Sequence, residues 1–170
     1  MDLVITEASI PDLGGKIAVV TGGASGIGFA AVKILAAHNA KTYILDIAEP
    51  EEPLPAGATF VHCDTTSWND LRLAFAQAGH VDIAIANAGV SEEEDYFEDK
   101  TDEWGELQEP EYRVVEVNYR GVLNFVKLAI SAMKHGPDVG GSIVITSSAT
   151  AYAPEQSLPV YSASKLAVRD

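Results

Sequence analysis

The sequence is poor in cysteine, in basic residues and in long hydrophobic runs. Cys63 is the single cysteine in 170 residues, so an internal disulfide and a multi-cysteine metal site are both excluded. No apolar run approaches the ~18 residues that a membrane-spanning helix needs. The N-terminus carries an acid, Asp2, where a secretory signal peptide carries basic residues. These absences predict a cytoplasmic protein, in a reducing compartment and without a membrane partner.

Basic residues are outnumbered by acidic ones, 11 against 25, which gives a net charge of −14. A chain of this charge repels nucleic acid and anionic lipid, so neither is an expected partner. The excess is local, because residues 92–116 hold twelve acidic residues and only two basic ones. The acids from Glu92 to Asp99 lack the glycine and the alternation of a calcium loop, so we interpret the stretch as a solvated acidic insertion at about 91–112. No metal is expected from the histidines either, which have no ligand spacing: His38, His62, His80 and His135.

What the sequence does contain is an alternation of short apolar runs with helical patterns. With 47% hydrophobic and 21% charged residues, the chain has the composition of one globular domain, spanning 1–170. The apolar runs predict buried parallel strands at 16–21, 42–46, 59–63, 81–86 and 142–146. Helices are predicted from about Gly26, from Ser67 as N-cap, over about 114–133 with a break at 136–137, and from Pro159 through Asp170. This order predicts an α/β fold with a doubly wound parallel sheet.

A glycine cluster lies between the first predicted strand and the first helix, in the pattern Gly22-x-x-x-Gly26-x-Gly28. Glycines there let the chain turn sharply and let a pyrophosphate approach the N–H groups at the start of a helix. Asp46 follows eighteen residues after Gly28, at the end of the second strand. A carboxylate at that place binds both ribose hydroxyls of NAD and repels the 2′-phosphate of NADP. The pattern therefore favours NAD binding, and the alternative is a tight turn with a solvated aspartate.

Tyr161 and Lys165 are four residues apart, so on a helix both project from one face. A phenol with an ordinary pKa of about 10 is a poor base, but a neighbouring ammonium and a positively charged nicotinamide favour the phenolate. Such a pair can therefore serve as a general base at a dry site. Taken alone, the same spacing also describes an exposed helix pair.

Six motifs follow one another along the chain from about Lys16 to Asp170. They are Thr21-Gly22-x-x-x-Gly26-x-Gly28, Asp64, Asn87-Ala88-Gly89, Asn118, Ser148 and Tyr161-x-x-x-Lys165. In this order they resemble the short-chain dehydrogenase/reductase family. The resemblance implies a Rossmann-type dinucleotide-binding domain and NAD-dependent hydride transfer between a secondary alcohol and a ketone. Around 117–122 and 145–152 the sequence is similar to the NAD-dependent alcohol dehydrogenases near hydroxyprostaglandin dehydrogenase.

The resemblance also implies a role for each matched position. Ser148 is expected to hydrogen-bond the reacting oxygen, in preference to Ser147, while Tyr161 exchanges the proton. Lys165 is expected to hold the nicotinamide ribose and to favour the phenolate, and Asn118 to bend the long helix and hold a water. The remaining positions are expected to serve cofactor binding: Gly22, Ser25, Gly26, Ile27 and Gly28 in the glycine loop, Asp46 at the ribose, Asp64 at the adenine amine, Asn87 tying the fourth strand to its neighbours, and Ala88 and Gly89 leaving room for the adenosine ribose. The segment 152–160 borders the pocket in the family, and its apolar residues favour an apolar substrate.

The chain departs from the family in length, because it stops five residues after Lys165. The resemblance implies that a sixth strand, a substrate lid and a seventh strand are missing, so the strand at 142–146 would be an exposed edge. Three explanations are open: a portion of a longer or nicked chain, a truncated product that folds by association, and a repurposed protein that binds a nucleotide or a partner without turnover. We expect a homo-oligomer or association with a C-terminal segment. The chain alone is expected to be neither a stable monomer nor a competent dehydrogenase.

Overall fold

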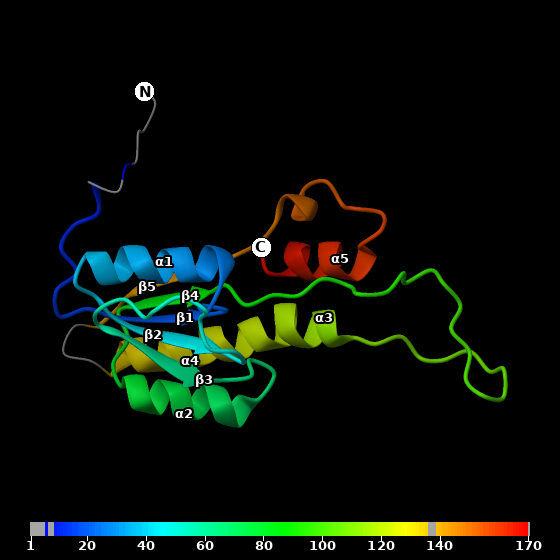
Figure 1. Ribbon diagram of the computed structural model, residues 1–170, viewed down its shortest axis with the longest axis horizontal. Helices are drawn as coiled ribbons and strands as arrows, with labels where there is room; N and C mark the ends of the chain where they lie inside the picture. The colour runs from blue at the N-terminus through cyan, green and yellow to red at the C-terminus, as the bar shows by residue number, and fades with distance from the viewer. Residues whose placement is uncertain (1–5, 7–8, 136–138, 170) are drawn as a thin grey trace.

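Five parallel strands form one twisted sheet at the centre of the computed structural model, which describes residues 6, 9–135 and 139–169 (Figure 1). The strand order across the sheet is β3-β2-β1-β4-β5. The strands are β1 (Ile17–Thr21), β2 (Lys41–Asp46), β3 (Ala58–His62), β4 (Ile83–Ala86) and β5 (Ser142–Ile145). The order reverses direction between β1 and β4, so the carboxyl ends of these two strands open a crevice, where such sheets bind ligands.

Helices cover both faces of the sheet (Figure 1). Helix α1 (Gly26–Ala37) packs Phe29 and Val32 against Val20 and Ile44 on one face. On the other face lie α2 (Trp68–Ala78) and α4 (Val122–Lys134). Phe75 of α2 and Phe125 of α4 meet in the larger core cluster, where their ring centroids are 5.3 Å apart. The predicted doubly wound α/β sheet is therefore confirmed, and so is Ser67 as N-cap of α2, since its hydroxyl accepts from the Asp70 N–H.

The segment predicted as one long helix over 114–133 is helical, but its hydrogen bonding changes along its length. It starts as α3 (Arg113–Val115), widens into a π-helical segment (Glu116–Gly121) and continues as α4. The predicted helix is present, and its π-helical part lies where the resemblance implies a bend at Asn118. The π-helical hydrogen bonding itself was not predicted, because the periodicity of apolar residues does not reveal a local i→i+5 pattern. The wider turn contains Asn118, which is fully buried.

Helix α5 (Pro159–Ala167) is shorter than predicted. It ends at Ala167 instead of continuing, while Asp170 and the predicted break at 136–137 lie outside the described residues. The last turn tightens, since the Arg169 N–H donates to the Leu166 carbonyl three residues earlier at 3.2 Å. The Arg169 side chain has tertiary partners: Nη1 donates to the Ala151 carbonyl at 3.0 Å, and the guanidinium lies over the Tyr152 ring. Strand limits differ from the prediction by one or two residues, chiefly at β4, which begins at Ile83.

Strand β5 lies at one edge of the sheet, and among the described residues it pairs only with β4. Its Val144 side chain is 52% exposed. The structure thus presents the open edge that the sequence predicts, while the association expected to cover it stays a prediction. No helix among the described residues is both long and apolar enough to cross a membrane.

The acidic segment projects away from the sheet between β4 and α3 (Figure 1). It contains no regular helix or strand, apart from one isolated bridge between Thr101 and Leu107. For residues 93–111, all of which the structure describes, each hydrogen bond and ion pair found closes within the segment itself, such as Lys100 with Glu94 and the Gln108 N–H with the Lys100 carbonyl. This part of the insertion therefore makes no polar contact with the sheet.

Candidate active site

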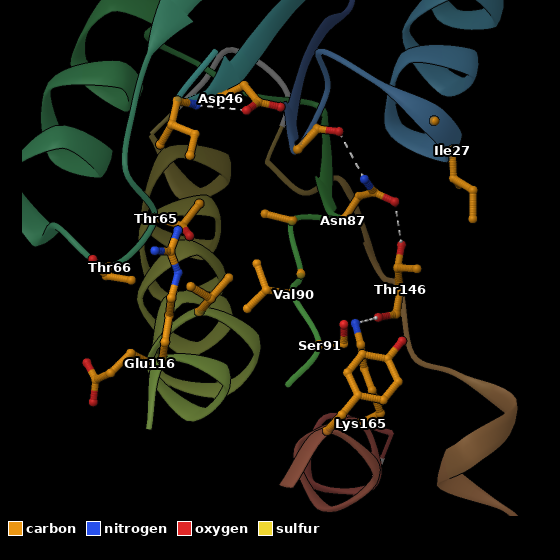
Figure 2. Close-up of a pocket in the computed structure, with 18 of the residues that line it drawn as sticks. Ile27, Asp46, Thr65, Thr66, Asn87, Val90, Ser91, Glu116, Thr146 and Lys165 are labelled. Carbon is orange, nitrogen blue, oxygen red and sulfur yellow. Dashed lines mark hydrogen bonds between the residues drawn. The ribbon is translucent and has the colours of Figure 1, made fainter. Parts of the chain in front are cut away.

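A cleft of about 1120 Å³ opens at the carboxyl ends of the strands (Figure 2). Most of the predicted site residues line it: Gly22, Ser25, Gly26, Ile27, Asp46, Asp64, Asn87, Ala88, Gly89, Ser148, Tyr161 and Lys165. Gly28 and Asn118 are buried next to the cleft without lining it. Residues far apart in the sequence are thus brought into one cavity by the parallel sheet.

The glycine loop between β1 and α1 is closely packed and leaves room for a ligand. Gly22 and Gly26 have φ angles of +61° and +52°, which favour glycine. A Cβ on Gly28 would lie 2.1 Å from the Gly22 carbonyl oxygen, so the loop can fold back on the helix only with glycine there. Ser25 occupies the N-cap position of α1 but makes no side-chain cap bond. The first N–H groups of α1 are therefore available to an anion in the cleft.

We expect Gly28→Ala to lower the free energy of unfolding by more than about 2 kcal/mol, because the new methyl group meets backbone atoms that are held by the sheet. The matched control is Gly26→Ala, whose Cβ would meet open space. That control should cost only the strain of a positive φ, about 1–2 kcal/mol. Urea unfolding of the two variants measures the difference. A smaller loss for Gly28→Ala than for Gly26→Ala would contradict the packing described for the loop.

Three strands are joined by side chains just behind the cleft. The Thr21 hydroxyl oxygen accepts from the N–H groups of Asn87 and Ala88 at 3.1 and 3.2 Å. Asn87 Nδ2 donates to the Gly22 carbonyl at 3.1 Å, and the Thr146 hydroxyl donates to Asn87 Oδ1 at 3.3 Å (Figure 2). The glycine loop, the end of β4 and the end of β5 therefore form one connected unit. Thr146 was not predicted, since a threonine at the end of a strand gives no signal in the sequence.

Two aspartates lie on the β2 and β3 side of the cleft. Asp46 accepts hydrogen bonds from the N–H groups of Ile47 at 2.8 Å and Ala24 at 3.1 Å, so it is tied to the glycine loop. Asp64 accepts from the N–H and the hydroxyl of Thr66, both at 2.8 Å. Both carboxylates are thereby held in fixed orientations at the edge of the cavity.

Lys165 is buried beneath the cleft, with only 4% of its surface exposed. Its ammonium donates to the Thr146 carbonyl at 2.9 Å (Figure 2) and lies 5.7 Å from the centre of the Tyr161 ring. Burial disfavours the charged form and lowers the pKa of Lys165 below its ordinary value. The predicted pair of phenol and ammonium is therefore brought together on one face of α5.

The two neighbouring serines have different partners. The Ser148 oxygen accepts from the N–H of Thr150 at 3.2 Å and from its hydroxyl at 3.0 Å, where it caps a short 3₁₀ turn (Ala149–Ala151). The Ser147 hydroxyl instead donates to the Lys165 carbonyl at 2.8 Å. Because Ser148 accepts two bonds, its own proton stays available to an oxygen in the cleft. The geometry favours Ser148 over Ser147 as a donor to a ligand.

Asn118 uses its side-chain amide as a clamp on the chain that leaves β4. Its Oδ1 accepts from the Val90 N–H and its Nδ2 donates to the Val90 carbonyl, both at 2.8 Å. Nδ2 also donates to the Ser164 hydroxyl at 3.1 Å. Both amide protons are therefore used by the protein, and the water expected at this residue stays a prediction.

The prediction that the whole acidic stretch is solvated was wrong for Glu92. Its carboxylate accepts from backbone N–H groups of α5, because the chain leaving β4 passes beside that helix. Arg120 also went unpredicted: it lines the cleft, pairs with Glu116 and donates to the Thr66 carbonyl at 3.2 Å. The i, i+4 spacing of Glu116 and Arg120 was a signal for their pairing. Among the described residues, no group of three or more His, Cys, Asp or Glu is placed to hold a metal ion.

The parallel sheet with its glycine loop, and the Tyr-x-x-x-Lys helix beside the same cleft, define a Rossmann-type α/β protein with a titratable pair at its ligand crevice. The chain belongs to the short-chain dehydrogenase family, whose family model matches residues 16–170.

Comparison with known proteins supports the assignment. The chain is 58% identical over 165 residues to the short-chain dehydrogenase/reductase prx4 of Penicillium roqueforti, covering 96% of this chain and 50% of that protein. It is 51% identical over 174 residues to the short-chain dehydrogenase/reductase ATR7 of Stachybotrys chlorohalonatus, covering 98% and 53%. The structure is also similar to 3-ketoacyl-(acyl-carrier-protein) reductase from Brucella melitensis complexed with NADH, with a TM-score of 0.72, 29% identity and coverage of 92% and 66%. The chain spans about half the length of the curated relatives it matches.

Proposed function

We propose that the protein is an NAD-dependent oxidoreductase that interconverts a secondary alcohol and a ketone by hydride transfer. The observation that carries the proposal is a single cleft lined both by the glycine loop with Asp46 and by Ser148, Tyr161 and Lys165. Asp46 and Lys165 lie on opposite sides of the view in Figure 2. A dinucleotide bound along this cleft would have its adenosine half near the aspartates. Its reactive half would then lie near the pair of phenol and ammonium. The sequence at 117–122 and 145–152 further supports the proposal that the protein resembles the NAD-dependent alcohol dehydrogenases near hydroxyprostaglandin dehydrogenase.

The residues present fit a nicotinamide dinucleotide. The unused N–H groups at the start of α1 suit a pyrophosphate, and the glycines let it approach closely. Asp46 suits the ribose hydroxyls, while Asp64 and the neighbouring backbone suit the adenine amine. When bound, the cofactor accepts or donates the hydride. The structural relative from Brucella melitensis is complexed with NADH.

The chain's own groups handle the substrate oxygen and its proton. The free proton of Ser148 would hydrogen-bond the carbonyl or alkoxide oxygen. The Tyr161 hydroxyl would give or take the proton, and the Lys165 ammonium lies 5.7 Å from the centre of its ring. Leu158 and Tyr161 give the neighbouring wall of the cleft an apolar surface, which supports an apolar substrate.

Because the 170-residue chain alone is expected not to turn over a substrate, the proposal is tested on the protein joined to, or mixed with, the C-terminal segment that the family resemblance implies, and all variants below are measured in that form. NAD and a panel of apolar secondary alcohols are added, and the absorbance of NADH is followed. We expect NADH to form with at least one alcohol. Binding of NADH with no oxidation of any alcohol, and no reduction of the matching ketones, would instead favour a protein that binds the nucleotide without turnover.

We expect NADH to bind at least about tenfold more tightly than NADPH, since a carboxylate near a 2′-phosphate costs a few kcal/mol at an effective dielectric of about 20. Asp46→Asn keeps the size of the side chain but removes its charge, so it should reduce the preference. Glu49→Gln makes the same charge change at an exposed position nearby and should leave the preference unchanged. Titration of each protein with both cofactors measures the ratio. Equal or tighter binding of NADPH by the wild type would refute the NAD assignment.

A further inference from the structure

Helix α5, which carries Tyr161 and Lys165, has no cap of its own. Leu158 occupies the N-cap position, where it offers no side-chain acceptor, and the first turn contains no acidic residue. Pro159 begins the helix and has no N–H to satisfy. The Ser162 N–H makes the first intrahelical bond, to the Leu158 carbonyl at 3.0 Å. Two backbone donors of the first turn, those of Val160 and Tyr161, therefore need a partner from elsewhere.

That partner is the carboxylate of Glu92. Its Oε1 accepts from the Val160 N–H at 2.6 Å and from the Tyr161 N–H at 3.1 Å, while Oε2 also accepts from Tyr161 at 3.1 Å. The cap thus comes from a residue that lies 68 positions before Val160 in the sequence. A carboxylate at this place opposes the positive end of the helix dipole and makes charge-assisted hydrogen bonds.

Glu92 is one of three points at which the chain leaving β4 contacts the Tyr161–Lys165 region. Val90 is joined by the Asn118 amide to the Ser164 hydroxyl, which itself donates to the Tyr161 carbonyl at 2.7 Å. A Cβ on Gly89 would lie 3.2 Å from the Lys165 ammonium, so the backbone runs directly beside that group. The segment 89–92 therefore lies along one turn of α5, and Glu92 fixes the end that carries Tyr161.

We propose that Glu92 is a positioning residue for the reaction: it holds the first turn of α5 in the register that places the Tyr161 hydroxyl against the substrate oxygen. The inference rests on the proposed dehydrogenase function. Because Tyr161 itself donates to Glu92, loss of the cap acts on the backbone of the residue that transfers the proton. Loss of the cap leaves the glycine loop and Asp46 untouched, so cofactor binding should survive.

Three variants test the role of Glu92. Glu92→Ala removes the acceptor, whereas Glu92→Gln keeps one acceptor oxygen and removes the charge. The control is Glu93→Ala, which removes an exposed acid from the next position. For each, kcat is expressed per NADH-binding site, so an unfolded fraction does not count. The primary deuterium isotope effect on kcat is measured with an alcohol deuterated at the reacting carbon.

We expect Glu92→Ala to lower kcat about 10- to 100-fold, the scale on which a misplaced catalytic group affects rate. The Kd for NADH should change less than about threefold, and the isotope effect should rise because the chemical step becomes slower. Glu92→Gln should recover part of the loss, and Glu93→Ala should match the wild type. A wild-type kcat and isotope effect in Glu92→Ala would overturn the inference.

Hydrogen exchange separates this inference from the proposed function. The backbone N–H groups of Val160 and Tyr161 should exchange at least about tenfold faster in Glu92→Ala than in Glu93→Ala, because a free N-terminal turn frays. Unchanged exchange would overturn the contact whatever the activity. If exchange rises but the wild type oxidises no alcohol, the proposed function fails and the positioning role in that reaction fails with it, while the cap stands as a structural contact.

Discussion

Tyr161→Phe is expected to reduce turnover at least about hundredfold, the usual value of a positioned acid or base, while the Kd for NADH changes less than about twofold. The substitution removes one hydroxyl and leaves the ring that lies near the Lys165 ammonium. It also keeps the backbone N–H that donates to Glu92, so the helix should not move. Steady-state oxidation of a secondary alcohol and a titration with NADH together measure the separation of the two effects.

Tyr152→Phe is the matched control for this prediction. Tyr152 belongs to the same part of the chain, but 76% of its surface is exposed and its ring stacks on Arg169. The control should retain kcat within about threefold, since surface substitutions away from a functional group have small effects. If Tyr161→Phe kept more than about a tenth of the wild-type rate, its role in acid–base catalysis would be wrong.

The second large effect is expected from Lys165→Met, which should lower turnover about 10²- to 10⁴-fold and weaken NADH binding about tenfold or more. The ammonium lies beside the Tyr161 ring, and it is proposed to bind the nicotinamide ribose. At neutral pH the variant should nevertheless be no less stable than the wild type. The reason is that a buried ammonium, whose pKa is lowered by burial, destabilises the folded state while it is charged. Water in the cleft can take the place of the lost bond to the Thr146 carbonyl.

The lowered pKa of Lys165 also determines whether the stability of the folded chain rises or falls with pH. The pKa of Lys165 is lower in the folded chain than its ordinary value of 10.5, so between the two values the unfolded chain binds more protons. The stability of the wild type should therefore rise relative to Lys165→Met as the pH increases toward 10.5. Lys127→Met removes an exposed lysine from α4 and should show no such trend. Urea unfolding at several pH values tests this, and a relative loss of wild-type stability with rising pH would contradict it.

Much of the fold could be predicted because its signals are local. Apolar runs such as Val19 to Thr21 and the glycines after them identify a buried strand and its turn, whatever the rest of the chain does. The π-helical segment at Glu116–Gly121 could not be predicted, since apolar periodicity does not distinguish i→i+5 from i→i+4 bonding and does not encode the contact of Asn118 with Val90. The end of α5 at Ala167 was missed for a similar reason, since apolar periodicity does not reveal the i→i−3 bond from the Arg169 N–H to the Leu166 carbonyl.

The candidate site divides in the same way. Positions such as Asp46 and Tyr161 were predicted from residue type and spacing, and the structure brings them to one cleft. The hydrogen-bonding roles of the Ser147 and Ser148 hydroxyls could not be predicted. The two serines differ only in the partners that the fold gives them, so the sequence does not tell which hydroxyl keeps a free proton. The acidic composition led to a wrong prediction at Glu92. An acid inside an acidic run is expected to be solvated, but the fold brings the first turn of α5 beside this one.

Because the hydrogen bonds of residues 93–111 close within that segment, the acidic projection is not coupled to the candidate site by polar contacts. Before this segment, the chain is held by hydrogen bonds of Val90 with Asn118 and of Glu92 with α5. After it, regular structure resumes with α3 at Arg113. A substitution between these two points therefore breaks no hydrogen bond or ion pair with the sheet. Insertions, deletions and charge changes there can therefore accumulate as neutral variation, or be selected for a separate purpose, while the geometry of the cleft is preserved.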